Sequence, residues 1–343
     1  MTPTEPAPSG LGLPDITRRR FLATSAAAAF VAGVGTQGRL SSVAAQPIDA
    51  SPMFPGFERA RIQTKEVTIN VVRGGRGRPV LLLHGWPQMH VIWHKIAPKL
   101  ATEFTVVATD LRGYGDSGKP VGGGDHAAYS KRTMAQDQVD VMTQLGFDTF
   151  AVVGHDRGAR VAHRLALDHA SRVTKLAVID VVPALRVYES LTKEMAVAYW
   201  HWFFMRLPEP IPETILGNNV DFFFKKLSQR EPPGTFTNEA MAEYIWAFRD
   251  PATIRAGCED FRATASIDLG HDQADRDQSR KISCPLLVLW GEHGQVGPFF
   301  KDVLAVWRDF ATNVAGRVLP GGHFLPEELP GETYQEVRAF LIS

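Results

Sequence analysis

Short continuous runs of apolar residues, rich in valine, leucine and isoleucine, recur along the chain from residue 67 onward. Such runs are typical of strands in a parallel sheet, because helices cover both faces of that sheet. Segments long enough for helices separate them, among them 132–145 and 159–169. The pattern predicts an α/β fold with a mostly parallel sheet, helices on both faces, and ligands beyond the carboxyl ends of the strands. The expected strands are 67–72, 80–83, 105–108, 150–153, 176–179, 286–290 and 318–319.

This alternation stops between residues 183 and 272, where aromatic residues are frequent and prolines interrupt the segment 207–212. The pattern there predicts helices without a core strand, so we expect a helical lid inserted between two strands of the sheet. The expected organisation is a first core part at 46–182, the lid at 183–272 and a second core part at 273–343.

The first 45 residues have the layout of an export signal. The sequence TRRRFL at 17–22 places arginines just before the apolar run 26–34, and small residues at 43–45 suit a signal peptidase. This order is that of a secretory signal, and the arginine pair before Phe-Leu resembles the twin-arginine type. The apolar run is too short to span a bilayer comfortably, so we expect no stable membrane anchor. We expect residues 1–45 to direct export by the twin-arginine machinery, which would give a periplasmic or secreted protein.

Composition narrows the functional classes. The chain is 44% hydrophobic and 22% charged, which is ordinary for a globular protein with a large core. Its 37 Lys and Arg residues balance 37 Asp and Glu residues, which argues against a nucleic-acid binder. Cys258 and Cys284 lie in no CxxC motif and near no ligand-spaced histidine, so a zinc site or disulfide scaffold is not expected. We expect both to be buried free thiols.

Candidate chemistry begins at the sequence GHDRG, residues 154–158, which follows an expected strand and opens an expected helix. Small residues at 154, 158 and 159 permit the sharp turn of a nucleophile elbow, which exposes the side chain of Asp156. A carboxylate nucleophile suits displacement at a saturated carbon and gives an ester that water must then cleave. The aspartate therefore disfavours a serine-type esterase. An ordinary Gly-Asp turn is the alternative.

The partners of such a nucleophile have candidates elsewhere in the chain. The backbone N–H of Trp86, in the sequence HGWP after an expected strand, would form an oxyanion hole with that of Arg157. His323, on a glycine-rich loop after another expected strand, would be the base. Its orienting acid is Asp180 or Glu292, since each follows a strand; we take Asp180 and keep Glu292 as the alternative.

Arg157 and Arg160 lie three residues apart at the start of an expected helix, on neighbouring positions of one face. The planar donor pair of a guanidinium matches a carboxylate. Two such groups beside Asp156 would dock an anionic substrate and offset its repulsion from the nucleophile. The alternative is that they form structural salt bridges.

Taken together, these motifs resemble the haloacetate (fluoroacetate) dehalogenases of the α/β-hydrolase fold, over essentially the whole chain after the leader. The resemblance implies that His201 and Trp202 donate N–H bonds to the departing halide. It also places a lid tyrosine of the family at or near Phe261, which cannot donate, so chloride or bromide release is more plausible than fluoride release. The motifs are 85–88 (GWPQ), 110–115 (DLRGYG), 155–160 (HDRGAR), 201–202 (HW) and 322–326 (GHFLP). Epoxide hydrolases and haloalkane dehalogenases share the first two.

The sequence therefore predicts a hydrolase that cleaves the carbon–halogen bond of a small haloacid through an ester on Asp156, giving a 2-hydroxy acid and halide. No metal or organic cofactor is required. One alternative is an epoxide hydrolase with Tyr188, Tyr199 or Tyr244 as the acid. Another is a non-catalytic exported protein that binds small carboxylates. The true substrate and the oligomeric state stay open, although relatives often look dimeric and a homodimer is one option.

Overall fold

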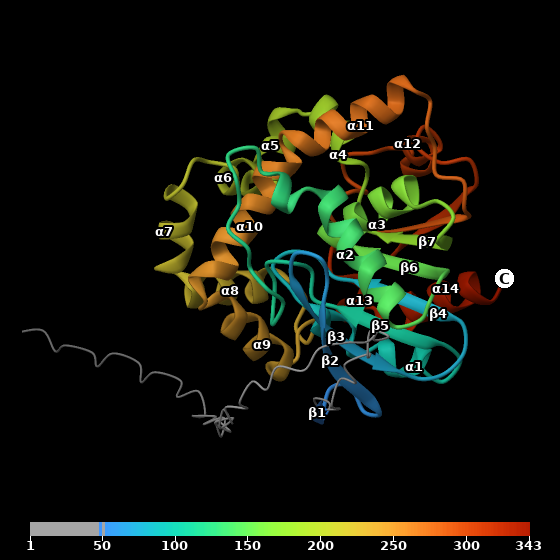
Figure 1. The fold of residues 1–343 in the computed structure, drawn as a ribbon. Helices are drawn as coiled ribbons and strands as arrows, with labels where there is room; N and C mark the ends of the chain where they lie inside the picture. Colours follow the sequence, from blue (N-terminus) through green and yellow to red (C-terminus); the bar gives the residue numbers. More distant parts are fainter. Residues whose placement is uncertain (1–47, 50–51) are drawn as a thin grey trace, which may run out of the picture. The chain divides into compact units, whose positions relative to one another are not determined.

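A computed structural model describes residues 48–49 and 52–343, and the expected export signal at 1–45 lies outside them. Within the described residues, nine strands form one sheet in the order β1-β2-β3-β5-β4-β6-β7-β8-β9 (Figure 1). Strands β5, β4, β6, β7, β8 and β9 are parallel, while β1, β2 and β3 join the sheet antiparallel. The strands are β1 (Ile48–Asp49), β2 (Phe57–Gln63), β3 (Thr68–Gly74), β4 (Pro79–Leu83), β5 (Thr105–Thr109), β6 (Phe150–His155), β7 (Val173–Ile179), β8 (Leu286–Gly291) and β9 (Val314–Leu319).

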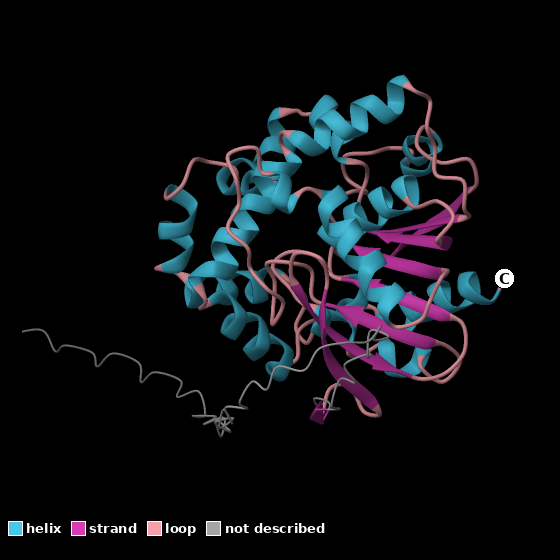
Figure 2. Cartoon of the chain, viewed as in Figure 1, coloured by secondary structure: helices cyan, strands magenta, loops and turns pink. Residues whose placement is uncertain are grey.

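From β4 onward, helices occupy the connections between consecutive strands (Figure 2). Helix α3 packs on β6, β7 and α2, and α1 packs on β5 and α14. Outside the connection from β7 to β8, the helices are η1 (His90–Trp93), α1 (Ala97–Leu100), η2 (Ala127–Tyr129), α2 (Lys131–Gln144), α3 (Asp156–Asp168), α12 (Val303–Arg308), α13 (Leu325–Glu328) and α14 (Pro330–Ile342).

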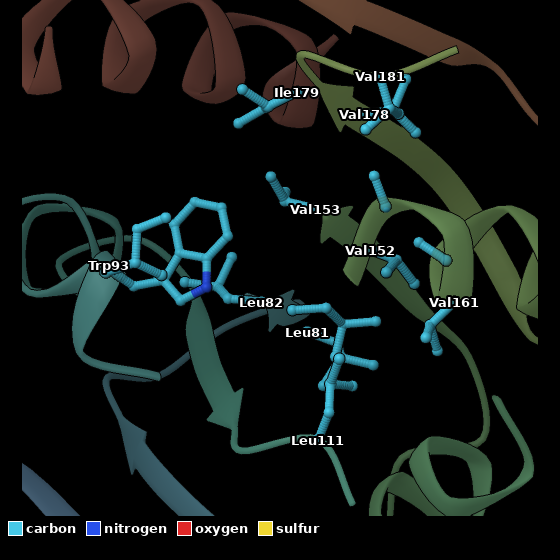
Figure 3. Packing of buried hydrophobic residues seen from close by; sticks show 14 of the residues in the cluster. Leu81, Leu82, Trp93, Leu111, Val152, Val153, Val161, Val178, Ile179 and Val181 are labelled. Atoms are coloured by element: carbon cyan, nitrogen blue, oxygen red, sulfur yellow. The ribbon is translucent and has the colours of Figure 1, made fainter. Parts of the chain in front are cut away.

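The core lies on both faces of the central strands. Successive residues of a strand point to opposite faces, yet Leu81 and Leu82 of β4 are both fully buried, as are Val152 and Val153 of β6. Figure 3 shows these side chains packed with those of the neighbouring strands. Both faces are therefore covered, which explains why the continuous apolar runs predicted these strands correctly. The predicted α/β fold is confirmed.

Strand β2 has no counterpart among the expected strands. Its sequence FERARIQ contains charged residues, and its exposure varies along the strand because it lies near the sheet edge. It pairs antiparallel with β3 along its whole length, Phe57 opposite Gly74 and Gln63 opposite Thr68.

The segment between β7 and β8 contains eight helices and no strand within the described chain. The expected lid at 183–272 falls inside this segment, which continues to Asp277. Four of its helices, α6, α8, α9 and α10, each place an aromatic ring against Trp86, in the loop after β4. The helices are α4 (Ala184–Glu189), α5 (Lys193–Ala198), α6 (Trp200–Met205), α7 (Ile211–Gly217), α8 (Val220–Arg230), α9 (Asn238–Phe248), α10 (Pro251–Thr264) and α11 (Ile267–Asp277).

The two cysteines are free; Cys258 is buried in α10, and Cys284, before β8, is only partly buried. Burial raises the pKa of the Cys284 thiol to about 11. None of the described helices has both the length and the apolar character needed to cross a bilayer.

Candidate active site

The chain turns from β6 into α3 at Asp156, whose φ is +46°. Such a backbone is strained for a residue with a side chain and persists only where the surroundings hold it. Gly158 makes the turn possible, because a Cβ at that position would lie 2.3 Å from the carbonyl oxygen of His84. At Gly154 a Cβ would lie 2.6 Å from Cα of Ala159. The strand–turn–helix geometry is that of a nucleophile elbow.

The Asp156 carboxylate is fixed at the end of the sheet. The backbone N–H of Trp86 donates to its Oδ1 at 3.0 Å. The N–H of Arg157 lies in the first turn of α3, where helical N–H groups have no partner within the helix. Burial alone would raise the pKa of Asp156, but the basic side chains around it outweigh burial and bring the pKa below its usual value; they are His323, His155, Arg157 and Arg160.

His323 stands between two carboxylates. Its Nδ1 donates to Oδ2 of Asp180 at 2.6 Å, and its Nε2 lies 3.9 Å from Oδ2 of Asp156. Asp180 is held in turn by the backbone N–H groups of Gly291, at 3.1 Å, and Gln295, at 2.9 Å. Glu292 is exposed. Of the two acids that the sequence left open, Asp180 is the one that contacts the histidine.

The protonation of His323 depends on both carboxylates. Burial lowers its pKa, but the hydrogen bond and charge of Asp180 and the charge of Asp156 raise it more, so the pKa lies above its ordinary value. Because the Asp180 carboxylate accepts, Nδ1 carries the proton, and Nε2 faces Asp156 as the atom that can take up or release one.

Two residues outside the sequence-based set hold the loop of His323. The carboxylate of Glu328 accepts from the backbone N–H groups on either side of the histidine, those of Gly322 and Phe324, each at 2.6 Å. Nε2 of His155 donates to the carbonyl oxygen of His323 at 2.8 Å. Burial lowers the pKa of His155 to about 4, so this imidazole is neutral at neutral pH. His155 belongs to the motif 155–160 and Glu328 lies just beyond the motif 322–326, but their contacts are with backbone, which no motif encodes.

The two arginines after the nucleophile have different surroundings. Arg157 is fully buried, with Nη2 2.5 Å from Oδ1 of Asp260 and Nε 3.0 Å from Oδ2. Asp260 also accepts from the Tyr114 hydroxyl at 2.6 Å and pairs with Lys131. This differs from the expectation that both guanidinium groups face a substrate, because that of Arg157 is already engaged by a carboxylate. Its Nη1 has no hydrogen-bond partner among the described residues.

Arg160 is also buried, but no carboxylate of the described residues lies within ion-pair distance of it. One nitrogen, Nη1, donates to the carbonyl oxygen of Val182 at 2.9 Å, and the guanidinium lies 4.6 Å above the Trp202 ring. Its Nε has no partner within the described chain. A buried cation without a counter-ion is energetically costly, so this position favours an anionic ligand.

His201 and Trp202 project from α6 into the same site. The His201 ring stacks on Trp86, with centroids 5.5 Å apart and planes 7° from parallel. Burial lowers the pKa of His201 to about 3, so it is a neutral imidazole with one N–H to donate. Phe261 lies edge-on to both, its centroid 5.9 Å from that of His201 and 6.2 Å from that of Trp202. The phenylalanine therefore occupies the corner where the resemblance placed a tyrosine.

A cavity of about 480 Å³ joins these groups. Asp156, His323, Arg160, His201 and Trp202 all line it, whereas Arg157 is not among its lining residues. The described residues contain no group of three or more His, Cys, Asp or Glu side chains placed to hold a metal ion.

The three tyrosines proposed as acids for an epoxide hydrolase are dispersed. Tyr199 lines the cavity, but its hydroxyl donates to the carbonyl oxygen of Gln295 at 2.6 Å. The Tyr244 hydroxyl lies 3.1 Å from Glu327, and Tyr188 packs against Trp202; neither lines the cavity.

Comparison with known proteins agrees with this geometry. Residues 78–330 match the family model of the alpha/beta hydrolase fold, and the chain belongs to that family. Among curated relatives it is 45% identical to a fluoroacetate dehalogenase from Burkholderia sp over 292 residues, 84% of this chain and 95% of the relative. It is 34% identical to a soluble epoxide hydrolase from Corynebacterium sp. (strain C12) over 268 residues, 76% of this chain and 89% of the relative.

A solved structure from Nostoc sp PCC 7120, named only for its α/β-hydrolase fold, is 55% identical. Its TM-score is 0.82, and the match covers 84% of this chain and 99% of that one. The protein is a hydrolase of this fold.

Proposed function

We propose that this hydrolase removes the halogen from a small haloacid through an ester on Asp156. The observation that carries the proposal is Arg160, a buried cation with no carboxylate partner in the described chain, in the same cavity as the buried carboxylate of Asp156. A substrate carboxylate at Arg160 would supply the counter-ion and place the neighbouring carbon near the nucleophile.

In the first step, Asp156 attacks the halogen-bearing carbon. A carboxylate oxygen forms the new carbon–oxygen bond, and the carbon–halogen bond breaks with its electron pair going to the halide. The N–H groups of His201 and Trp202 stabilise the leaving halide. The low pKa of Asp156 keeps the nucleophile ionised at neutral pH.

In the second step, His323 takes a proton from water while the water oxygen attacks the ester carbonyl carbon. The backbone N–H groups of Trp86 and Arg157 stabilise the oxyanion that forms. As the intermediate collapses, the imidazolium of His323 returns its proton to the departing alkoxide oxygen, which expels the 2-hydroxy acid. Asp156, now with one oxygen from water, loses the remaining proton to solvent and is a carboxylate again. Asp180 holds the imidazolium in place.

The first step prepares the base for the second. The charge of Asp156 is one of the causes that raise the pKa of His323. Ester formation removes that charge, so the pKa of His323 falls in the intermediate. The histidine is then more fully neutral, as a general base must be.

The halide corner favours chloride and bromide. Phe261 beside His201 and Trp202 leaves two N–H donors and no hydroxyl there. Fluoride depends most on hydrogen bonding as it leaves, so we expect chloroacetate and bromoacetate to react faster than fluoroacetate.

The relatives support this chemistry, since one is named as a fluoroacetate dehalogenase. The epoxide hydrolase alternative is less favoured, because the hydroxyl of Tyr199, the one candidate tyrosine in the cavity, donates to a backbone carbonyl. A non-catalytic carboxylate binder would not need the Asp156–His323–Asp180 arrangement.

Replacing the base separates the two steps. His323→Gln should release about one chloride per active site from chloroacetate and then stop, with the carboxymethyl ester detected by mass spectrometry on the peptide containing Asp156. Asp156→Asn, the matched control, should give neither chloride nor ester. Sustained chloride release by His323→Gln would overturn the assigned role.

We also propose that the chain is exported by the twin-arginine route. A full-length Arg18→Lys, Arg19→Lys variant should remain in the cytoplasmic fraction, while the unaltered chain is recovered outside it. Equal export of both would refute the route.

A further inference from the structure

The cavity is much larger than a haloacetate. Such a molecule has about five heavy atoms and occupies the space of about four water molecules, or about 120 Å³. The cavity measures about 480 Å³, so a haloacetate bound at Asp156 and Arg160 would leave most of it unused.

The unused part has apolar walls. It extends from Trp86 and Phe324 near the nucleophile to Leu216 of α7 and Phe223 and Leu227 of α8. Phe223 packs against Trp86 with centroids 5.4 Å apart, which joins the α8 wall to the floor of the site. A substituent lying here would contact aliphatic and aromatic carbon over most of its surface.

The rim of the cavity is mixed: Asn219, Lys226 and Arg230 line it and are exposed, and large apolar side chains lie beside them. Three of its lining residues, Trp200, Ile215 and Phe222, are 49%, 50% and 62% exposed. They belong to α6, α7 and α8, so the opening lies between these helices. Large apolar side chains exposed around a cavity are typical of a site that takes up a ligand with an apolar part.

We propose that the substrate is a 2-haloacid whose second carbon carries an apolar chain or ring of about four to six carbons, rather than a haloacetate. The carboxylate lies at Arg160, the halogen faces His201 and Trp202, and the apolar group lies between α7 and α8. This inference rests on the proposed function and adds the shape of the substrate to it.

A homologous series tests it without changing the reacting centre. 2-Bromopropanoate, 2-bromobutanoate and 2-bromohexanoate all react at a secondary carbon, so differences among them report binding of the chain. Each buried methylene should raise kcat/KM by about two- to fourfold, or about 10- to 60-fold from the propanoate to the hexanoate, measured as bromide release.

Filling the cavity should abolish this gain. Leu227, half-buried on α8, lines the cavity, while the next residue, Ser228, is exposed and does not. In Leu227→Trp the ratio of kcat/KM for 2-bromohexanoate to that for 2-bromopropanoate should fall at least about fivefold, because the indole takes the space of the chain. Ser228→Trp, the same substitution one position along, should keep the wild-type ratio.

The possible outcomes test the inferred substrate shape separately from the proposed dehalogenase function. Bromide release from bromoacetate and 2-bromopropanoate with a flat or falling series would overturn the inference and leave the dehalogenase proposal standing. Faster turnover of 2-bromoadipate, which ends the same chain in a carboxylate, than of 2-bromohexanoate would also overturn it. Absence of bromide release from every acid would refute the dehalogenase proposal itself.

Discussion

Two arginines one turn apart on α3 should respond to the same substitution in opposite ways. Arg160 is buried with no ion pair in the described chain, whereas Arg164, which is also buried, pairs with Asp272 at 2.9 Å and Asp275 at 2.5 Å. Methionine has a similar length and no charge. Arg160→Met therefore removes a buried cation that has no ion pair, whereas Arg164→Met leaves Asp272 without an ion-pair partner and Asp275 with Arg280 alone.

The magnitudes follow from this difference. Replacing a poorly compensated buried charge by an apolar residue is often neutral or stabilising by about 1–4 kcal/mol, and losing the bond to Val182 costs about 1 kcal/mol. We expect the free energy of unfolding of Arg160→Met to lie between about 1 kcal/mol below that of wild type and about 3 kcal/mol above it. For Arg164→Met we expect a loss of about 3–5 kcal/mol.

The two variants should show the reverse order in activity: Arg160→Met should lose kcat/KM, and Arg164→Met should keep it. A charge-assisted hydrogen bond is worth about 1.5–3 kcal/mol, so loss of the substrate's contacts with Arg160 should lower kcat/KM for chloroacetate by about 100-fold. Arg164 does not line the cavity, and its variant should keep kcat/KM close to wild type at a temperature where it is folded.

Urea unfolding with an unchanged m-value gives the stabilities, and chloride release gives the rates. If Arg160→Met lost as much stability as Arg164→Met, Arg160 would be a structural residue. If it kept wild-type kcat/KM, the substrate carboxylate would bind elsewhere. Either result would refute the reasoning.

Three further predictions concern the halide, the base and its loop. Phe261→Tyr should raise the fluoroacetate-to-chloroacetate rate ratio by about tenfold, since one added hydrogen bond is worth about 1.4 kcal/mol; an unchanged ratio in a fluoride-release assay would place Phe261 outside the halide corner. At about pH 5, rapid quench should show a halide burst followed by slow turnover, because the pKa of Asp156 is lowered from its ordinary value near 4, while the hydrogen bond and charge of Asp180, which ester formation does not remove, still raise the pKa of His323; loss of the burst itself would contradict this assignment. Glu328→Gln should slow ester hydrolysis about tenfold while sparing the burst, because one of two backbone contacts beside His323 loses its acceptor; equal slowing of both steps would mean that Glu328 acts on the whole site.

Much of the fold could be predicted from the sequence because the central strands carry a strong local signal. Every residue of β5 and β6 is buried, and burial on both faces selects continuous apolar runs. β2 gave no such signal, since its position near the edge tolerates Glu58, Arg59 and Arg61 within the strand. The glycines around Asp156 were informative for a similar reason: the turn brings two backbones so close that no side chain fits.

The local sequence pattern could not decide whether Asp180 or Glu292 orients His323. Both follow parallel strands that are neighbours in the sheet, so both residues lie at the carboxyl ends of these strands. What separates them is backbone direction: Asp180 has a φ of +49°, and the amides of Gly291 and Gln295 hold its carboxylate. Those amides lie at the end of β8 and in the loop after it, more than 100 residues away in the sequence. The sequence supplied the two candidates, and tertiary structure made the selection.

The arginine pair extends this argument to charge. Arg157 and Arg160 have the same side chain, the same helix and the same helical face, and the sequence treats them alike. Asp260, from lid helix α10, forms an ion pair with Arg157 and none with Arg160. The carboxylate of Asp260, 103 residues from Arg157 in the sequence, neutralises Arg157 and fixes its side chain against the lid. Arg160 has no such partner and faces the cavity as a cation. Substrate recognition in this site therefore depends on which positive charge the fold does not compensate, a property that no single segment of the sequence contains.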